Sequence, residues 1–372
     1  MRVKLDDVIA RITGNVDRFN TDLEYYVGGE HYDYASIAIY NKGLLKSEKG
    51  SMLGFKFHFP FQKGDTLFMA RNPHLKKAGM VTYDGICSDA SYVLRTKDHK
   101  VLLPEFLPLI IQNDLFWAFF EANKSGSVNY LMNWKEMRNY EFELPSIERQ
   151  KAIADMVWAA ERTRKAYISL VEATDELVKS QFIEMFGNPI NNNKQWPTQP
   201  LKKVAPEHTP QIPSVEKYWW LNLDMIESYS GIVIEKVYAE RSEIGSSTST
   251  FDDTMVLYSK LRPYLNKVVV PEDFGYATTE LVGLKPDSSV LNKYFLFNLL
   301  RGDDFVSYAN GISGGAQMPR MPVKALREFE CILPPMELQE QFVALSEQSD
   351  KSKLTSKFNQ EVCICLQKPI LK

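Results

Sequence analysis

The chain has 372 residues, of which 44% are hydrophobic and 12% aromatic, and its formal net charge is −3. A chain of this length is expected to form two or three domains, and its apolar content is sufficient for two cores. It contains no run of eighteen apolar residues, and the residues after Met1 lack the apolar stretch of a signal peptide, so we expect a cytoplasmic protein. Residues 1–145 carry 18 basic and 18 acidic groups, and none of the later segments is strongly basic either. This charge distribution excludes a broad cationic surface.

The first 145 residues are predicted to form an α/β module. Residues 64–70 and 88–94 have the composition of strands. Residues 104–121 then carry apolar side chains at helical spacing after a proline that is well placed for a first turn. A glycine turn at residues 125–127 follows this predicted helix.

A long helix is predicted over residues 146–189. Ser146 is a good N-cap residue, and Glu148 in the first turn is favoured by the helix dipole. Gly187 and Pro189 form a stop signal. About forty residues at 1.5 Å each span roughly 60 Å, which is wider than a small domain. One module alone therefore cannot bury such a helix.

Residues 190–334 repeat the order of the first module. Strand-like residues 252–257 and 277–284 precede a predicted helix at 291–308 and a glycine-rich turn at 311–315. We therefore expect a second α/β module, and we expect twisted sheets in both modules.

The motif Leu-Pro-x-x-Glu-x-Gln occurs at residues 144–150 and again at 333–339, each time where a module ends and a long polar helix is predicted to begin. A displacement of 189 residues is too long for a solenoid repeat. The sequence therefore predicts duplication of a whole domain together with its helix.

The second predicted helix occupies residues 335–372, and both helices carry a narrow apolar stripe with a spacing near seven. One such helix could equally pack on its own domain. Two helices of this kind are most simply explained as an antiparallel coiled coil. The predicted seam and partner-binding positions are Ile153, Val157, Ala160, Tyr167, Val171, Val178, Phe342, Leu345, Leu354 and Phe358.

The four cysteines are predicted to be reduced thiols rather than disulfides or metal ligands. Cys87 and Cys331 lie in apolar strand-like runs and are expected to be buried and inert. Cys363 and Cys365 lie near the end of the chain, and no histidine follows His208 to complete a zinc site. We therefore expect no metal site.

The order of module, long helix, module and long helix resembles the specificity subunit of type I restriction-modification systems. The repeated motif carries this resemblance, together with the helix exit at residues 180–189 and the segment 260–267 of the second module. It implies two target-recognition domains, residues 1–145 and 190–334, each reading one half of a split, asymmetric DNA sequence. It also implies that residues 146–189 and 335–372 hold the two domains at a fixed separation.

The resemblance implies partners that carry the chemistry. Two modification subunits would bring S-adenosylmethionine and methylate adenine, and restriction subunits would cut DNA with ATP and Mg²⁺. The chain itself would bind no cofactor and would be non-catalytic. In agreement, the sequence lacks an Asn-Pro-Pro-Tyr-like adenine pocket, a Gly-x-x-x-x-Gly-Lys-Ser/Thr phosphate loop, and an Asp/Glu-x-Lys nuclease motif after Asp287.

One feature departs from the family pattern. Ser180 in the first helix corresponds to Pro369 in the second, and proline would break that helix early. The end of the chain also lacks a counterpart of residues 186–189. The second helix is therefore predicted to be truncated, which bears on the coiled-coil length and on docking of one modification subunit.

DNA recognition needs cations for phosphates and paired donors and acceptors for base edges. Each module offers a proline-centred basic segment and a glycine turn, where backbone amides can approach phosphate. The predicted DNA-binding residues are Arg71, Asn72, His74, Lys76, Lys77, Asn129, Tyr130, Lys260, Arg262, Tyr264, Asn266, Lys267, Gln317 and Arg320. Alternatively, these charges belong to solvated loops and Tyr264 to the core. The adjacent aromatics Tyr218, Trp219 and Trp220 more often fill a core than stack on bases.

Two other function classes remain open at this point. The chain could be a standalone DNA methyltransferase or nuclease with an unfamiliar active site. It could also be a helical adaptor that docks proteins without binding DNA. Turnover by the chain alone would favour the enzyme, and retained assembly without sequence-specific binding would favour the adaptor.

Overall fold

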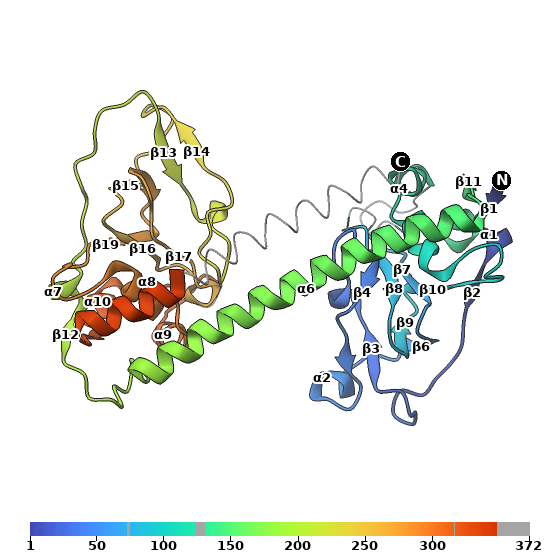
Figure 1. The fold of residues 1–372 in the computed structure, drawn as a ribbon, viewed down its shortest axis with the longest axis horizontal. Helices are drawn as coiled ribbons and strands as arrows, with labels where there is room; N and C mark the ends of the chain where they lie inside the picture. Colours follow the sequence, from blue (N-terminus) through green and yellow to red (C-terminus); the bar gives the residue numbers. More distant parts are fainter. Residues whose placement is uncertain (73–74, 124–130, 316, 348–372) are drawn as a thin grey trace. The chain divides into compact units, whose positions relative to one another are not determined.

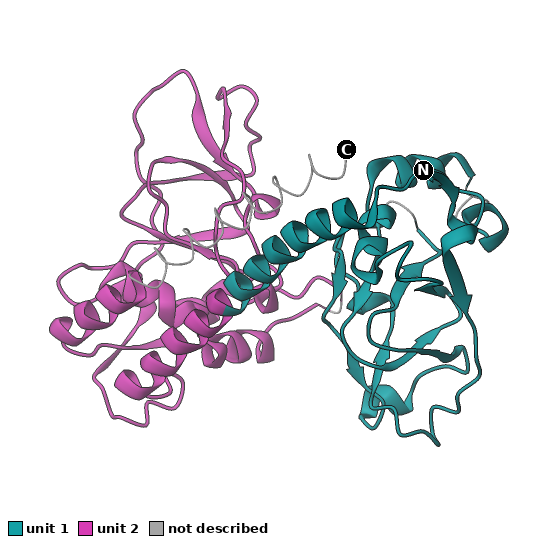
Figure 2. Cartoon of the chain, turned by 45° about the vertical axis from the view of Figure 1, so that its right-hand side comes forward, with its two compact units in different colours: residues 1–169, 356–372 teal, residues 170–355 magenta. Residues whose placement is uncertain are grey.

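The computed structural model describes residues 1–72, 75–123, 131–315 and 317–347 (Figure 1). The described chain divides into two compact units, which are unit 1 with residues 1–169 and unit 2 with residues 170–347 (Figure 2). The boundary falls inside one long helix, so each unit includes part of that helix. Both units combine sheets with short helices, which confirms the predicted mixed fold class. None of the helices within the described ranges is long and apolar enough to span a bilayer.

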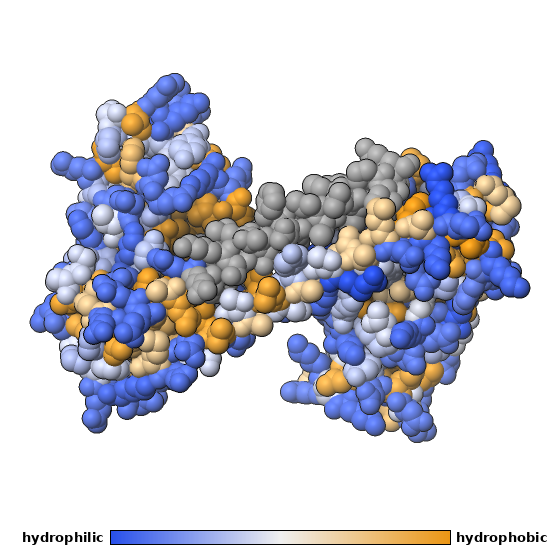
Figure 3. All heavy atoms as spheres, viewed as in Figure 1, coloured by the Kyte–Doolittle hydropathy of each residue, from blue (hydrophilic) through white to orange (hydrophobic). Residues whose placement is uncertain are grey.

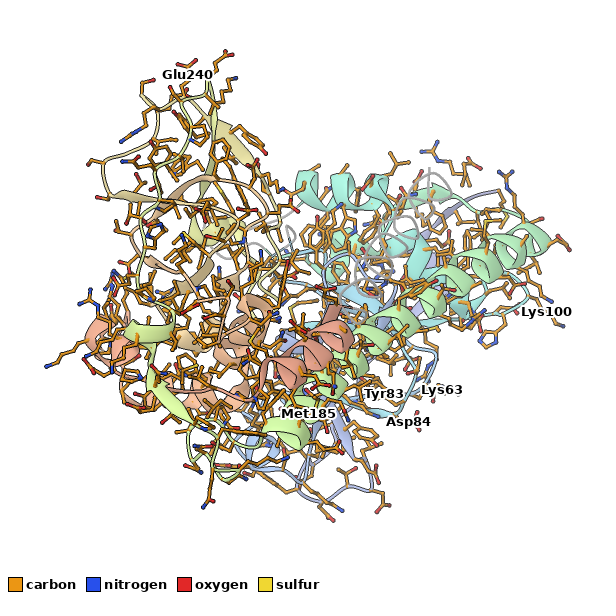
Figure 4. The ribbon with its side chains drawn as sticks, turned by 60° about the vertical axis from the view of Figure 1, so that its left-hand side comes forward. Lys63, Tyr83, Asp84, Lys100, Met185 and Glu240 are labelled. Carbon is orange, nitrogen blue, oxygen red and sulfur yellow. The ribbon has the colours of Figure 1, made fainter. Side chains whose placement is uncertain are left out.

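Unit 1 contains a five-stranded and a four-stranded sheet. The first sheet has, in spatial order, β2 (Ile9–Ile12), β10 (Ser91–Thr96), β7 (Thr66–Met69), β8 (Ala78–Val81) and β4 (Ala38–Ile39). The second has β5 (Gly43–Leu44), β3 (Tyr25–Val27), β9 (Gly85–Ser88) and β6 (Phe57–Phe61). Only the pairs β4 with β8 and β3 with β9 are parallel. Between β6 and β7 the Lys63 backbone N–H donates to the Asp84 carboxylate at 2.7 Å (Figure 4).

Aromatic side chains of one helix pack on the five-stranded sheet to form the main core of unit 1. The short helices of unit 1 are α1 (Leu5–Val8), η1 (Gly29–His31), α2 (Glu48–Ser51), η3 (Pro104–Phe106), α3 (Leu107–Ile111), α4 (Asp114–Asn123) and α5 (Trp134–Met137). The Phe68 ring of β7 lies 5.8 Å from that of Phe116 and 5.6 Å from that of Phe120, both in α4. Burial of each such ring stabilises the unit by about 1.5–3 kcal/mol.

The prediction of one continuous helix at residues 104–121 is wrong. The chain forms η3, α3 and α4 in succession, because Asn113 ends one helix and caps the next. Its side-chain oxygen accepts a hydrogen bond from the Leu115 N–H at 2.8 Å. An asparagine that bonds to nearby backbone groups competes with a continuous helix.

The strand predicted at residues 88–94 is also two elements. It covers the end of β9 and the start of β10, which belong to different sheets and are joined by a turn at Asp89 and Ala90. The Ala90 carbonyl accepts a hydrogen bond from the Ala70 N–H at 3.0 Å. Apolar content identified the region as extended but did not locate this turn.

Unit 2 contains a three-stranded and a four-stranded sheet. The first has, in spatial order, β17 (Val268–Val269), β16 (Val256–Ser259) and β19 (Leu281–Leu284). The second has β14 (Val237–Ala239), β13 (Tyr218–Leu221), β18 (Gly275–Thr278) and β15 (Thr248–Phe251). The short helices are α7 (Leu201–Val204), η4 (Leu223–Met225), η5 (Pro263–Leu265), α8 (Lys293–Arg301), α9 (Asp303–Gly311) and α10 (Val323–Arg327).

The corresponding predictions for unit 2 need the same corrections. Residues 277–284 form the end of β18 and all of β19, with a turn between them, and β16 begins later than the predicted strand at 252–257. The helix predicted at 291–308 is divided into α8 and α9 at Gly302, whose backbone is extended with φ −61° and ψ 144°.

The two units share a topology, which confirms the predicted duplication. In each unit a short strand near the start pairs antiparallel with a strand that precedes the repeated motif. These pairs are β1 (Arg2–Lys4) with β11 (Glu141–Glu143), and β12 (Thr198–Pro200) with β20 (Glu330–Ile332). Each unit also has one parallel pair at the centre of its four-stranded sheet, β3 with β9 and β13 with β18.

The predicted long helix is present as α6 (Ile147–Phe186), which is continuous over 40 residues. The Ser146 hydroxyl accepts from the Arg149 N–H at 3.4 Å, and Gly187 follows the helix with φ +73°. Both end signals are therefore confirmed. Figure 3 shows apolar residues on the exposed surface of this helix. Leu170 and Leu177 of α6 are 52% and 54% exposed.

The predicted seam of α6 packs differently at its two ends. Val157 is buried in the core of unit 1 and Ile153 packs against that core, so these positions lie against their own module. Ala160, Tyr167 and Val171 are half-buried. Val178 is buried in the main core of unit 2.

The second helix begins at residue 336 and is described to residue 347. Phe342 is fully buried, and its ring lies 5.3 Å from that of Phe182 and 5.6 Å from that of Phe186 in α6. Leu345 packs against the same core. The two helices therefore contact each other within unit 2. Leu354, Phe358, Cys363, Cys365 and the predicted helix break at Pro369 lie outside the described residues.

Candidate nucleic-acid interface

The proline-centred segments form the same turn in both units. Asn72 and Lys76 have positive φ angles of 57° and 41°, and Arg262 and Asn266 have values of 49° and 48°. In unit 2 the Leu265 N–H donates to the Arg262 carbonyl at 2.8 Å, and in unit 1 the corresponding bond from residue 75 to residue 72 is 3.0 Å. Residues other than glycine and asparagine rarely adopt this left-handed backbone, so the strain lies at Lys76 and Arg262, and such strain concentrates at functional sites.

The segment that follows each predicted glycine turn lies beside the proline-centred segment of its unit. In unit 1 Arg71 forms a β-bridge with Leu131, and the Met132 N–H donates to the Ala70 carbonyl at 2.9 Å. Residues 70–71 and 131–132, which are far apart in sequence, therefore meet at one place, whereas the predicted glycine turn at 125–127 lies outside the described residues.

Unit 2 repeats this arrangement. Leu261 forms a β-bridge with Arg320, the Met321 N–H donates to the Lys260 carbonyl at 2.9 Å, and the Arg262 N–H donates to the Pro319 carbonyl at 2.7 Å. Each unit thus presents a single composite surface made from a strained turn and the segment that follows the glycines. Two equivalent surfaces on one chain fit a protein that reads two related targets.

Several predicted residues of unit 2 face outward. Tyr264 is 42% exposed at the apex of the turn, and Gln317 is exposed. Arg320 is exposed and pairs with Glu280, with Nη2 to Oε1 at 3.0 Å, and this carboxylate raises the pKa of Arg320. Arg262 is half-buried, and its Nε has no partner within the described ranges. These side chains supply aromatic, amide and cationic groups.

Two other predicted residues support the turn from within. The Lys267 Nζ donates to the Leu223 carbonyl at 2.6 Å, and loss of hydration on burial lowers its pKa. Asn266 is only 8% exposed and donates through Nδ2 to the Arg301 carbonyl at 2.8 Å. The structure therefore places these two side chains as supports of the turn. Lys260 is half-buried at the start of the same segment.

In unit 1 the basic side chains are partly engaged. The Lys76 Nζ lies 3.1 Å from the Asp114 carboxylate, and the Lys77 Nζ donates to the Gly29 carbonyl at 2.6 Å. Arg71 is exposed and Asn72 half-buried. His74, Asn129 and Tyr130 lie outside the described residues.

Two cation–aromatic contacts of unit 1 were not predicted. The Arg11 guanidinium lies 4.3 Å from the Tyr92 ring centroid, and the Lys42 ammonium lies 3.5 Å from that of Tyr25. The partners are far apart in sequence and pair only through the sheets, so no local pattern signals them.

The predictions of buried groups are confirmed. Trp219 and Tyr218 are buried in the cores of unit 2. Cys87 and Cys331 are buried free thiols, and burial raises the pKa of each to about 12. Among the residues that the structure describes, no group of three or more His, Cys, Asp or Glu side chains could hold a metal ion.

Comparisons with known proteins relate part of the chain to a family. Residues 1–166 match the family model of the type I restriction modification DNA specificity domain. The chain is similar to the type I restriction enzyme EcoDI specificity subunit of Escherichia coli, with 22% identity over 287 residues. That similarity covers 65% of this chain and 63% of the relative, so the chain matches less than two thirds of the relative's length.

Solved structures share the fold over the whole chain. An S subunit of a type I restriction-modification system from M. genitalium has a TM-score of 0.61 and 14% identity, over 100% of this chain and 95% of that one. A chain from a study of complex assembly in a type I system has a TM-score of 0.51 and 19% identity, over 100% and 96%.

The described chain thus has two modules of related fold. Residues 1–166 match the type I restriction modification DNA specificity domain, and the chain shares the fold of a type I restriction-modification S subunit. The resemblance carried by the repeated motif is confirmed.

Proposed function

We propose that the chain is the DNA sequence-specificity subunit of a type I restriction-modification complex that acts in the cytoplasm. Each unit reads one half of a bipartite, asymmetric site in double-stranded DNA. The helices set the spacing of the two halves and dock two modification subunits, and restriction subunits join the complex. The described residues include no candidate metal cluster, and the sequence lacks the nucleotide and nuclease motifs named above.

One observation carries the proposal. A turn with two left-handed positions lies beside the segment that follows the glycines once in each unit, but its side chains differ. The first left-handed position holds Asn72 in unit 1 and Arg262 in unit 2, and the second holds Lys76 and Asn266. An identical scaffold with different polar groups is what reading of two different half-sites requires.

The helix α6 supports the spacing role. It is continuous over 40 residues, and a helix of this length spans about 60 Å at 1.5 Å per residue. Trp158 near its start belongs to the core of unit 1, and Phe186 at its end belongs to that of unit 2. A rise that is fixed by backbone hydrogen bonds can serve as a ruler along DNA.

The chain itself performs no chemistry in this proposal. S-adenosylmethionine, ATP and Mg²⁺ are needed only by its partners, which methylate adenine and cut DNA. The basic groups of the two surfaces position the complex through phosphates, and a smaller set of side chains reads base edges.

The proposal is tested by expressing the chain with its modification subunits and sequencing methylated adenines across a genome. We expect one bipartite, asymmetric motif with a constant gap, and no turnover when the purified chain alone is incubated with DNA, Mg²⁺ and S-adenosylmethionine. Methylation or cleavage by the chain alone would instead favour the enzyme alternative. Assembly of a complex that methylates no defined sequence would favour the adaptor.

A further inference from the structure

Arg11 of β2 lies over two aromatic rings of unit 1. Its guanidinium carbon lies 4.3 Å from the ring centroid of Tyr92 and 5.9 Å from that of Trp134. The side chain is half-buried, and its Nε is buried without a hydrogen-bond partner within the described ranges. A stack of this kind fixes the plane of the guanidinium and thus the direction of its Nη donors.

Arg11 has no carboxylate partner in the part of the chain that the structure describes. Two other arginines of unit 1 are neutralised by a carboxylate. Arg95 Nε lies 2.6 Å from Asp65, and Arg138 Nη2 lies 2.5 Å from Asp6. The Arg11 charge is therefore held in one orientation but left uncompensated, which fits an anionic or acceptor-rich ligand.

The stack adjoins the candidate interface of unit 1. The Tyr92 hydroxyl donates to the Met132 carbonyl at 2.8 Å. Met132 belongs to the segment that pairs with the strained turn, through its N–H to the Ala70 carbonyl and through the bridge between Arg71 and Leu131. Arg11 thus extends the surface that Arg71 and residues 131–132 form.

The duplication supplies an internal comparison for Arg11. Arg11 pairs with Leu94 of β10, and the equivalent bridge in unit 2 joins Glu207 to Leu284 of β19. Glu207 forms an ion pair with Arg327, with Nε to Oε1 at 2.5 Å. The position that holds an arginine without a carboxylate partner in unit 1 therefore holds an ion-paired glutamate in unit 2.

The two rings are not repeated either. Tyr92 pairs with Phe68 across the sheet, and Val282 occupies the equivalent place opposite Tyr258. Trp134 is the first residue of α5, and Val323 is the first residue of α10. A stack that the fold required would occur in both units, as the strained turn does. The two units must differ in the residues that read the two different half-sites, and the stack is such a difference.

We propose that Arg11 is a specificity-determining residue that reads a guanine in the half-site recognised by unit 1. The planar guanidinium offers two donors in the geometry of guanine O6 and N7, which is the commonest specific contact in the major groove. Tyr92 and Trp134 are positioning residues that hold the plane. This inference rests on the proposed function and adds a residue and a base to it.

The experiment compares complexes that carry wild-type chain, Arg11→Gln or Arg11→Lys, each with the modification subunits. Methylation is measured on sites that differ by single base pairs. Both variants should lower discrimination at one base pair of one half-site by about 5- to 150-fold, because lysine keeps the charge but not the two-donor fork. All other positions should keep their preference. Arg18→Gln is the matched control, because Arg18 also stacks on an aromatic ring, Phe19, at 4.3 Å.

Two results would overturn the inference. A uniform loss of binding in Arg11→Gln that Arg11→Lys restores, with a salt dependence of log K reduced by about 0.9, would mark a phosphate contact instead. An unchanged base profile in Arg11→Lys would show no role in reading. Thermal unfolding is recorded for each variant, and Arg11→Lys carries the test if Arg11→Gln does not fold. A wild-type complex without any defined target sequence would contradict the proposed function of the chain rather than the role of Arg11.

Discussion

Gln150 and Gln339 make the same three hydrogen bonds at positions 189 residues apart. Gln150 accepts from the Leu103 N–H at 3.1 Å and donates to two backbone carbonyls at 2.9 and 3.0 Å. Gln339 accepts from the Asn292 N–H at 2.9 Å and donates to two carbonyls at 3.0 and 2.8 Å. Both side chains are fully buried. Each glutamine ties the first turn of a long helix to its own module, which explains why the motif ends in this residue.

Replacement of either glutamine should destabilise one unit only. Gln150→Leu leaves the Leu103 N–H and the carbonyls of Val101 and Pro145 without their partner, at about 1–3 kcal/mol per buried group. We expect a loss of about 3 kcal/mol in unit 1. Gln339→Leu should have the same effect in unit 2.

Hydrogen exchange measured by mass spectrometry separates the two effects, because protection is read for each unit. Gln181→Leu is the control, since this glutamine of α6 bonds only to Glu184 within the helix, at 2.9 Å. It should change stability by less than about 0.5 kcal/mol. Equal loss of protection in both units after Gln150→Leu would contradict the idea of separate clamps.

The left-handed backbone at Arg262 allows strain and recognition to be separated. Arg262→Gly and Arg262→Ala both remove the guanidinium, so both should weaken specific binding by about 1–3 kcal/mol. They should differ in stability, because glycine tolerates φ 49° and alanine does not, by about 1 kcal/mol in favour of glycine. Denaturant titration and DNA-binding assays measure the two quantities. Tight specific DNA binding by either variant would show that Arg262 is not part of the DNA interface.

The buried thiols should be unreactive in the folded protein. Burial raises the pKa of Cys87 and Cys331 to about 12, so at pH 8 almost no thiolate is present to react. A variant with Cys363→Ser and Cys365→Ser isolates this pair. A thiol reagent should label neither cysteine in the native state and both after unfolding. Rapid native labelling at pH 8 would show that these cores open readily.

The ruler role of the helices predicts a change in DNA spacing. Insertion of seven residues into α6 between Trp158 and Val178, with a matching insertion in the second helix, adds at most about 10 Å. This length corresponds to about 3 base pairs at 3.4 Å per step. Sequencing of methylated sites should show the same two half-sites with a longer gap. An unchanged gap would mean that the helices do not set the spacing.

The sequence predicted the architecture well, because the same local motifs occur in both copies of the duplicated domain. The signals at Ser146 and Gly187 depend on neighbouring residues, and both ends of α6 follow them. The repeated Leu-Pro-x-x-Glu-x-Gln motif located both helix starts. The proline-centred segments also pointed to equivalent places, since they form the same strained turn in both units.

Other features depend on contacts that a linear pattern does not contain. The breaks at Asn113 and Gly302 interrupt apolar runs whose periodicity predicted single helices. The sequence predicts Lys267 as a DNA-binding residue, but its ammonium group turns inward to the Leu223 carbonyl. The stack of Arg11 on Tyr92 requires two paired strands. Charge and spacing therefore identified the segments but not the direction of each side chain.

The central claim is that the two units read DNA independently. The core of unit 1 includes Ala154, Val157 and Trp158 of α6, so an exchange of modules must carry these residues along. The most direct measurement replaces residues 1–166 with those of another family member and sequences the methylated adenines. The account predicts that one half of the recognised site changes while the other half and the gap remain. A change in both halves, or in neither, would contradict it.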